Sequence, residues 1–233
     1  MGHTIEEVRP SLTPLRTSHP QRKYLDGLLL KNIQAQLIVE DEVVREEFGE
    51  ISFSDRGIEG AVALRVSRDA VDALIDDKRV KLVIDMKPAL DHKTLDSRIL
   101  SDFSEFINKD FINSLDALLP QKMIPIVVGL SGIDGRKKVN SITKEEREAL
   151  VSLIKNIEIP ISDFRPINEA IITKGGVSVS EVSPKTMESK LAAGLYFAGE
   201  VLDLDAYTGG FNLQIAFSTA TLACENAAWS SFE

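Results

Sequence analysis

The feature that most constrains the fold is a change in the spacing of hydrophobic residues near Asp91. Before it, four short segments alternate apolar and polar residues as strands do: residues 11–17, 33–40, 50–54 and 79–86. After it, apolar residues recur at helical spacing over residues 95–118. A second helix is predicted to begin at Thr143, because Thr143 and Glu146 have the spacing of a capping box. Strand character returns at Asn156–Phe164, so a helical module interrupts β structure.

Four further segments refine this prediction. Residues 60–77 carry apolar residues at intervals of three and four, which predicts a helix between the third and fourth strand candidates. The acidic run at residues 40–50 is interpreted as a solvated hairpin. Residues 170–182 are a second hairpin candidate, with a glycine pair supplying positive φ at its turn. The segment MIPIVVGL (Met123–Leu130) has the propensity of a strand, although helices surround it.

The 233-residue chain is acidic, with a formal net charge of −9. Phosphate groups bind cationic surfaces, so this charge argues against nucleic acid and anionic membranes as partners. No apolar run approaches the roughly 18–20 residues that span a bilayer. The single cysteine, Cys224, has no partner for an internal disulfide and is expected to be a small core residue of a cytoplasmic protein. The histidines are scattered, at His3, His19 and His92, so no metal site is predicted.

A strand, a turn, a glycine pair and a helix follow one another in LYFAGEVLDLDAYTGGFNLQIAFSTA, Leu195–Ala220. The strand is expected over Leu195–Gly199, with Glu200 at its carboxyl end, and the helix from about Gly210 to Ala228. A helix N-terminus presents unpaired amides and a partial positive charge, and glycines let a ligand approach the backbone. An acidic residue at the end of a strand meets ribose hydroxyls in open α/β sheets. A tight turn without a ligand explains the same pattern, and the residues alone leave both interpretations open.

Three blocks of the sequence resemble one family. EVSPKTMESKLAAGLYFAGEVLDLDAYTGGFNLQIAFSTA, residues 181–220, is similar to the C-terminal signature of the BaiN-like flavoproteins, a family of NAD(P)/FAD-dependent oxidoreductases. FGEISFSDRGIEGAVALRVSR and RPINEAIITKGGVS, residues 48–68 and 165–178, resemble the same family in the same order. The resemblance covers essentially the whole chain and is densest after Phe164.

The resemblance implies an α+β fold in three parts. Residues 1–90 and 156–164 would form an antiparallel β-barrel-like domain, with residues 91–155 as an inserted all-helical module. Residues 165–233 would be the C-terminal remnant of a Rossmann-like FAD-binding domain. The resemblance also implies a helix rather than a strand at Met123–Leu130, and we take the helix as the prediction.

The same resemblance implies a site for FAD. A glycine–glutamate pair would approach the ribityl or ribose hydroxyls, and the glycine pair and the two residues after it would turn their backbone toward the pyrimidine edge of the flavin. The predicted cofactor-binding residues are Gly199, Glu200, Gly209, Gly210, Phe211 and Asn212. No catalytic residue is predicted, because the flavin itself carries the hydride chemistry.

The family begins with a strand–helix unit that carries G-x-G-x-x-G and holds the pyrophosphate of FAD. No two of the 14 glycines of this chain have G-x-G spacing. We therefore expect a truncated flavoprotein that does not retain FAD when isolated. Two hypotheses follow. In the first, the chain belongs to an FAD-dependent oxidoreductase that transfers hydride between NAD(P)H and an unidentified substrate. In the second, it is a non-catalytic fragment or assembly module that folds without a complete cofactor site.

A second copy of the chain is the expected partner. The strand candidate before Glu200 carries no charge, and the helix after Gly210 has Glu225 as its late charge. An open strand edge and a long apolar helix face are aggregation hazards in a monomer. The prediction is a homodimer in which residues 166–230 of two chains cover one another.

Overall fold

The computed structural model describes residues 1–233 with the exception of residues 21, 56 and 231–233. The chain divides into two compact units. We call Leu15–Asp163 the barrel unit, and Met1–Pro14 together with Phe164–Glu233 the terminal unit.

Six strands of the barrel unit close into an antiparallel barrel in the order β2-β5-β4-β3-β6-β7. They are β2 (Leu15–Thr17), β3 (Leu29–Val39), β4 (Glu42–Ser54), β5 (Gly57–Glu59), β6 (Val80–Asp85) and β7 (Ile157–Phe164). Alternate residues of each strand face the barrel interior, and Leu37, Ile51 and Leu82 are fully buried there. The alternation in the sequence therefore located β3, the end of β4, β6 and β7 correctly, whereas only Leu15–Thr17 of the predicted strand at residues 11–17 belong to the barrel.

Short local signals set the connections of the barrel. Glu40 and Asp41 join β3 to β4 with φ of 48° and 72°, which are values of a tight hairpin turn, so the acidic run forms the predicted hairpin. The helix α2 (Ala61–Ile75) buries one face that includes Val62 and Val66, and it packs against β4. A one-turn helix, α1 (Arg22–Leu25), precedes β3.

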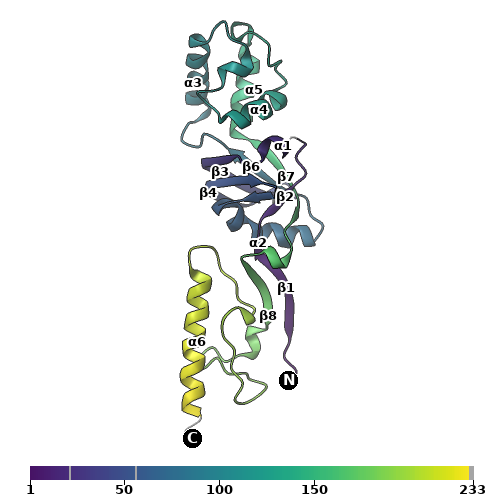
Figure 1. Cartoon of the computed structure of the whole chain (residues 1–233), viewed down its shortest axis with the longest axis vertical. Helices are drawn as coiled ribbons and strands as arrows, with labels where there is room; N and C mark the ends of the chain where they lie inside the picture. The colour runs from purple at the N-terminus through teal and green to yellow at the C-terminus, as the bar shows by residue number, and fades with distance from the viewer. Residues whose placement is uncertain (21, 56, 231–233) are drawn as a thin grey trace. The chain divides into compact units, whose positions relative to one another are not determined.

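The insertion between β6 and β7 is helical, and Figure 1 shows its helices clustered together. It contains α3 (His92–Glu105), α4 (Ile124–Ser131) and α5 (Lys144–Lys155), with 3-10 turns at Phe111–Ser114, Gln121–Met123 and Val139–Ser141. Every residue from 91 to 155 is described, and none lies in a strand. At the start of α5, Thr143 and Glu146 exchange hydrogen bonds of 2.7 and 3.2 Å in the predicted capping box. The predicted α+β fold, an antiparallel barrel with an all-helical insertion, is confirmed.

Inside the insertion, one prediction is confirmed and one needs correction. Propensity favours a strand at Met123–Leu130, but the segment forms most of α4, so the helix that the family resemblance implied and that we took as the prediction is confirmed. Its proline lies in the first turn, where its missing N–H costs nothing, and the apolar residues bury against the module. The helical spacing over residues 95–118 does not give one helix, because α3 ends at Glu105. The chain then turns so that the ring of Phe111 packs edge-on against Phe103, 6.3 Å away.

The terminal unit joins the two ends of the chain. The strand β1 (Ile5–Leu12) pairs antiparallel with β8 (Ile172–Val177) in a two-stranded sheet. A short 3-10 turn at Ile167–Glu169 precedes β8, and two more follow it at Val179–Glu181 and Gly199–Val201. The helix α6 (Phe211–Ser230) ends the described chain. A small core packs between these elements and consists of Val177, Val182, Met187, Leu202 and Ala223.

Three strand expectations fail in this unit because they depend on distant partners. β1 pairs with β8 rather than with a barrel strand, so the barrel begins at Leu15 and not at residue 1. The glycines of the expected hairpin turn lie inside β8 instead. Leu195–Gly199 is not a strand: Tyr196 makes an isolated bridge to Glu188, and the Gly199 N–H donates to the Thr219 hydroxyl at 2.9 Å. No described helix is long and apolar enough to cross a membrane.

Candidate functional site

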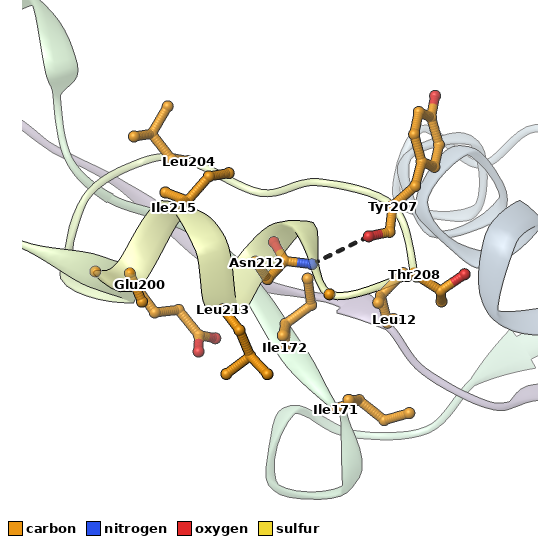
Figure 2. A pocket seen from close by; sticks show the side chains of 14 residues that line it. Leu12, Ile171, Ile172, Glu200, Leu204, Tyr207, Thr208, Asn212, Leu213 and Ile215 are labelled. Atoms are coloured by element: carbon orange, nitrogen blue, oxygen red, sulfur yellow. Dashed lines mark hydrogen bonds between the residues drawn. The ribbon is translucent and has the colours of Figure 1, made fainter. Parts of the chain in front are cut away.

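A cavity of about 440 Å³ lies within the terminal unit at the start of α6. Figure 2 shows the side chains that line it, from the end of β1, the start of β8, the loop before α6 and the first turns of α6. Most of the wall is apolar and comprises Leu12, Ile171, Ile172, Leu204, Leu213, Ile215 and Ala216. The remaining lining residues are Gly199, Glu200, Tyr207, Thr208, Gly209, Gly210 and Asn212. An apolar cavity with a few placed polar groups is typical of small-molecule sites.

Two glycines shape the backbone where the loop enters α6. Gly209 and Gly210 have φ of 116° and 89°, a region that side chains other than glycine rarely adopt. A Cβ on Gly210 would meet no atom within 4 Å, so the backbone is open to a neighbour there. The first intrahelical hydrogen bond of α6 runs from the Gln214 N–H to the Gly210 carbonyl, at 2.9 Å. The backbone N–H groups before Gln214 have no intrahelical acceptor. These amides can meet the carbonyl or anionic edge of a ligand.

The Asn212 side chain holds this loop in place. Its oxygen accepts from the Ala206 N–H at 2.8 Å, and its NH₂ group donates to the Ala206 carbonyl at 2.7 Å. A longer bond of 3.4 Å reaches the Tyr207 carbonyl, as drawn in Figure 2. Because the side chain is engaged with the loop, Asn212 has its backbone to offer to a ligand.

Glu200 stands at the outer edge of β8. Its Oε1 accepts two hydrogen bonds from Thr173, from the backbone N–H at 2.5 Å and from the hydroxyl at 2.6 Å. Two residues further along the strand, the Gly175 N–H donates to Asp203 Oδ1 at 3.1 Å. The two carboxylates thus take the place of the carbonyl groups that a third strand would supply to this edge.

Gly199 brings the loop close to α6. Its φ of 70° lies in the left-handed region, and a Cβ at this position would stand 3.7 Å from the Cβ of Ala216. Together with the bond to the Thr219 hydroxyl, this packing sets the distance between the loop and the helix. Gly199 therefore fixes where Glu200 emerges.

The structure brings five of the six predicted cofactor-binding residues to one cavity. Phe211 is the exception: it does not line the cavity, and its ring lies over Gly209 and is 60% exposed. Sequence reasoning missed the apolar walls from Leu12, Ile171 and Ile172. Each of these residues lies in a segment that the sequence predicts to be a strand. No pattern in the sequence, however, indicates that residue 12 lies close to residue 171 in the fold.

The helix α6 carries an apolar face toward solvent. Leu213 and Phe217 are 63% and 66% exposed, and Cys224 is exposed as well. The expectation that Cys224 is a core residue is therefore wrong: Ala223, beside it, takes the core position. Among the residues described, no group of three or more histidine, cysteine, aspartate or glutamate side chains is placed to hold a metal ion.

Comparison with known proteins assigns the chain to a family. A family profile described as "HI0933-like protein barrel and H2TH domain" matches residues 9–172, which is more than half of the chain. The chain belongs to this HI0933-like family. Its closed barrel agrees with that description, and the resemblance to BaiN-like flavoproteins is confirmed. The family is one of flavoprotein oxidoreductases, which does not favour the non-catalytic alternative.

Relatives of this HI0933-like chain include proteins named as a reductase and as dihydrouridine synthases. It is 30% identical to the 3-dehydro-bile acid delta(4,6)-reductase of Clostridium scindens, over 98% of this chain and 56% of that protein. It is 29% identical to the ribosomal RNA dihydrouridine synthase of Haemophilus influenzae, over 94% of this chain and 51% of that protein. It is 25% identical to the ribosomal RNA dihydrouridine synthase of Escherichia coli, over 94% of this chain and 52% of that protein. The chain thus spans about half the length of the curated relatives it matches.

Proposed function

We propose that this chain is the barrel-containing part of an FAD-dependent oxidoreductase and that the cavity at the start of α6 receives the flavin half of the cofactor. The observation that carries the proposal is the convergence of Glu200, the amides after Gly209 and an apolar wall on one cavity of about 440 Å³. A flavin ring system is flat and largely apolar, with a polar pyrimidine edge and a hydroxylated side chain. The residues present match these features in chemical type.

Each group of the cavity has a role in this proposal. FAD held in this cavity would supply the chemistry of hydride transfer between NAD(P)H and the substrate. The walls at Ile171, Ile172 and Leu213 exclude water from the ring. The amides at the start of α6 donate to the pyrimidine carbonyl groups, where the partial positive charge of the helix end favours electron-rich atoms. Glu200 accepts from side-chain hydroxyls of the flavin.

The relatives suggest the class of substrate. Their names give a delta(4,6)-reduction and the formation of dihydrouridine, and each of these adds hydrogen across a carbon–carbon double bond. We extend this reaction class to the present chain. The net charge of −9 supports a small substrate rather than RNA, because RNA binding needs a cationic surface.

We also propose a homodimer through residues 166–230 and a cytoplasmic location. The apolar side chain of Phe217 on α6 supports self-association, because it is 66% exposed and burying it against a second copy removes it from water. A single cysteine, with no disulfide to protect, suits a reducing compartment.

A charge placed in the cavity tests the flavin site. Leu213 lines the cavity but is 63% exposed, so Leu213→Asp should fold normally while setting a carboxylate against the ring. Leu191→Asp is the matched control, since Leu191 is 52% exposed and does not line the cavity. The whole chain is titrated at equilibrium with riboflavin, and binding is followed by quenching of the riboflavin fluorescence. The riboflavin affinity should fall about tenfold or more in Leu213→Asp and stay unchanged in Leu191→Asp. Equal binding by both variants would contradict the site.

A further inference from the structure

Thr173 makes two hydrogen bonds to Glu200, one more than the edge of β8 requires. Thr173 and Gly175 are alternate residues of β8, so their N–H groups point to the same side of the strand. Gly175 gives its carboxylate partner, Asp203, one hydrogen bond, whereas Thr173 gives Glu200 two, because its hydroxyl adds a 2.6 Å bond to the same oxygen. The second bond is not needed to satisfy the strand edge. It fixes the carboxylate.

The two oxygens of Glu200 are therefore not equivalent. Oε1 is occupied by both donors of Thr173, while Oε2 accepts from no group within the described part of the chain. Glu200 lines the cavity, and Figure 2 labels it among the lining side chains. A glutamate side chain that reaches solvent samples many rotamers, and two short charge-assisted bonds restrict it to one.

We propose that Thr173 is a positioning residue that holds Glu200 so that Oε2 accepts a hydrogen bond from a hydroxyl on the ribityl chain of the flavin. The inference rests on the proposed flavin site and adds to it a residue outside the cavity lining. Thr173 touches no part of the ligand. It acts through Glu200, and it makes binding selective for a flavin that carries a hydroxylated side chain.

The test compares two flavins that differ in that side chain. Riboflavin carries the ribityl hydroxyls, and lumiflavin has a methyl group in their place. The full chain is titrated at equilibrium against each flavin by fluorescence, as the unmodified protein and as Thr173→Val and Thr173→Ser. Thr173→Val removes the hydroxyl with little change of shape, and Thr173→Ser restores it. Riboflavin affinity should fall about tenfold or more in Thr173→Val and recover in Thr173→Ser, while lumiflavin affinity changes less than about twofold.

A second variant separates positioning from strand stability. Asp203→Ala removes the other carboxylate of the same β8 edge without touching the cavity lining, so it should change riboflavin and lumiflavin affinity by the same factor. Parallel loss of both flavins in Thr173→Val, or no loss of riboflavin, would overturn the role of Thr173. If the unmodified chain bound neither flavin, the flavin site itself would be refuted and this inference with it.

Discussion

Replacing Gly175 with alanine should open the β1–β8 sheet that carries one wall of the cavity. Gly175 lies opposite a bulge in β1, because Glu6 pairs with Gly176 and Arg9 pairs with Lys174, which leaves two residues of β1 facing one of β8. The backbones are so close there that a Cβ on Gly175 would stand 2.2 Å from the Glu7 carbonyl oxygen. Since the obstacle is backbone, no side-chain rotation can relieve the contact.

The size of the effect follows from two contributions. Gly175 has a φ of 94°, and a positive φ costs a residue with a side chain about 1–2 kcal/mol. A carbon–oxygen contact needs about 3.3 Å, so β1 must move by about 1 Å and lose roughly two ladder bonds at about 1 kcal/mol each. Gly194→Ala provides the control, because Gly194 has a φ of 75° and a Cβ there meets nothing within 4 Å. The two variants should differ by about 2 kcal/mol.

Hydrogen exchange is the suitable assay, because a chain of two compact units need not unfold in one step. Amide protection in β1 and β8 should fall about 30-fold further in Gly175→Ala than in Gly194→Ala, which is 2 kcal/mol expressed as an equilibrium constant. Protection in the barrel strands serves as the internal reference. Equal protection of β8 in the two variants would show that the close contact with Glu7 has no energetic consequence, and the reasoning would fail.

Four further predictions concern assembly, cofactor, pH and folding. Phe217→Ser should convert a sedimenting dimer to a monomer at micromolar concentration; a compact monomer of the unmodified chain with residues 195–225 protected from exchange would exclude the dimer. The isolated chain should lose FAD on gel filtration, because its glycines offer no G-x-G loop for the pyrophosphate, and a yellow eluate would refute this. Burial lowers the pKa of His19 in the folded chain below its unfolded value of 6.5. The contribution of neutral His19 to the free energy of unfolding is therefore fully present above pH 6.5 and decreases as the pH falls below it. In urea melts, His19→Gln should abolish this decrease between pH of about 7.5 and about 5.5. Thr143→Ala should destabilise the helical insertion by about 1 kcal/mol, measured by exchange in α5, whereas Thr221→Ala on α6 leaves α5 unchanged.

Local signals in the sequence predicted much of the barrel unit. Period-two alternation located β3 and β6, and the helical period located α2, because a half-buried element repeats its apolar residues in its own geometry. The capping box at Thr143 was legible because both of its partners lie within one turn. The helix α6 was predicted for the same reason, from the glycine pair before it and the apolar run within it.

Propensity failed where the surroundings decided between two forms. Met123–Leu130 has the composition of a strand, yet a proline near its start and burial against the insertion make it helical. Leu195–Gly199 is equally apolar, but its pairing stops at one isolated bridge between Tyr196 and Glu188, and the Gly199 amide is taken by the Thr219 hydroxyl. The composition of a short apolar segment therefore does not determine whether it forms a helix, a strand or a loop, because the segments that pack against it decide this.

The sequence by itself determined the residues of the candidate site that follow one another along the chain: Glu200, the glycine pair and the start of α6. Their spacing is local, and a helix start and its glycines lie within a few residues of each other. Only the tertiary structure decided that Leu12 and Ile171 close the same cavity and that Thr173 holds Glu200. The pairing of β1 with β8 joins residues more than 150 positions apart, and such a pairing depends on the free energy of the whole terminal unit rather than on any neighbouring residues.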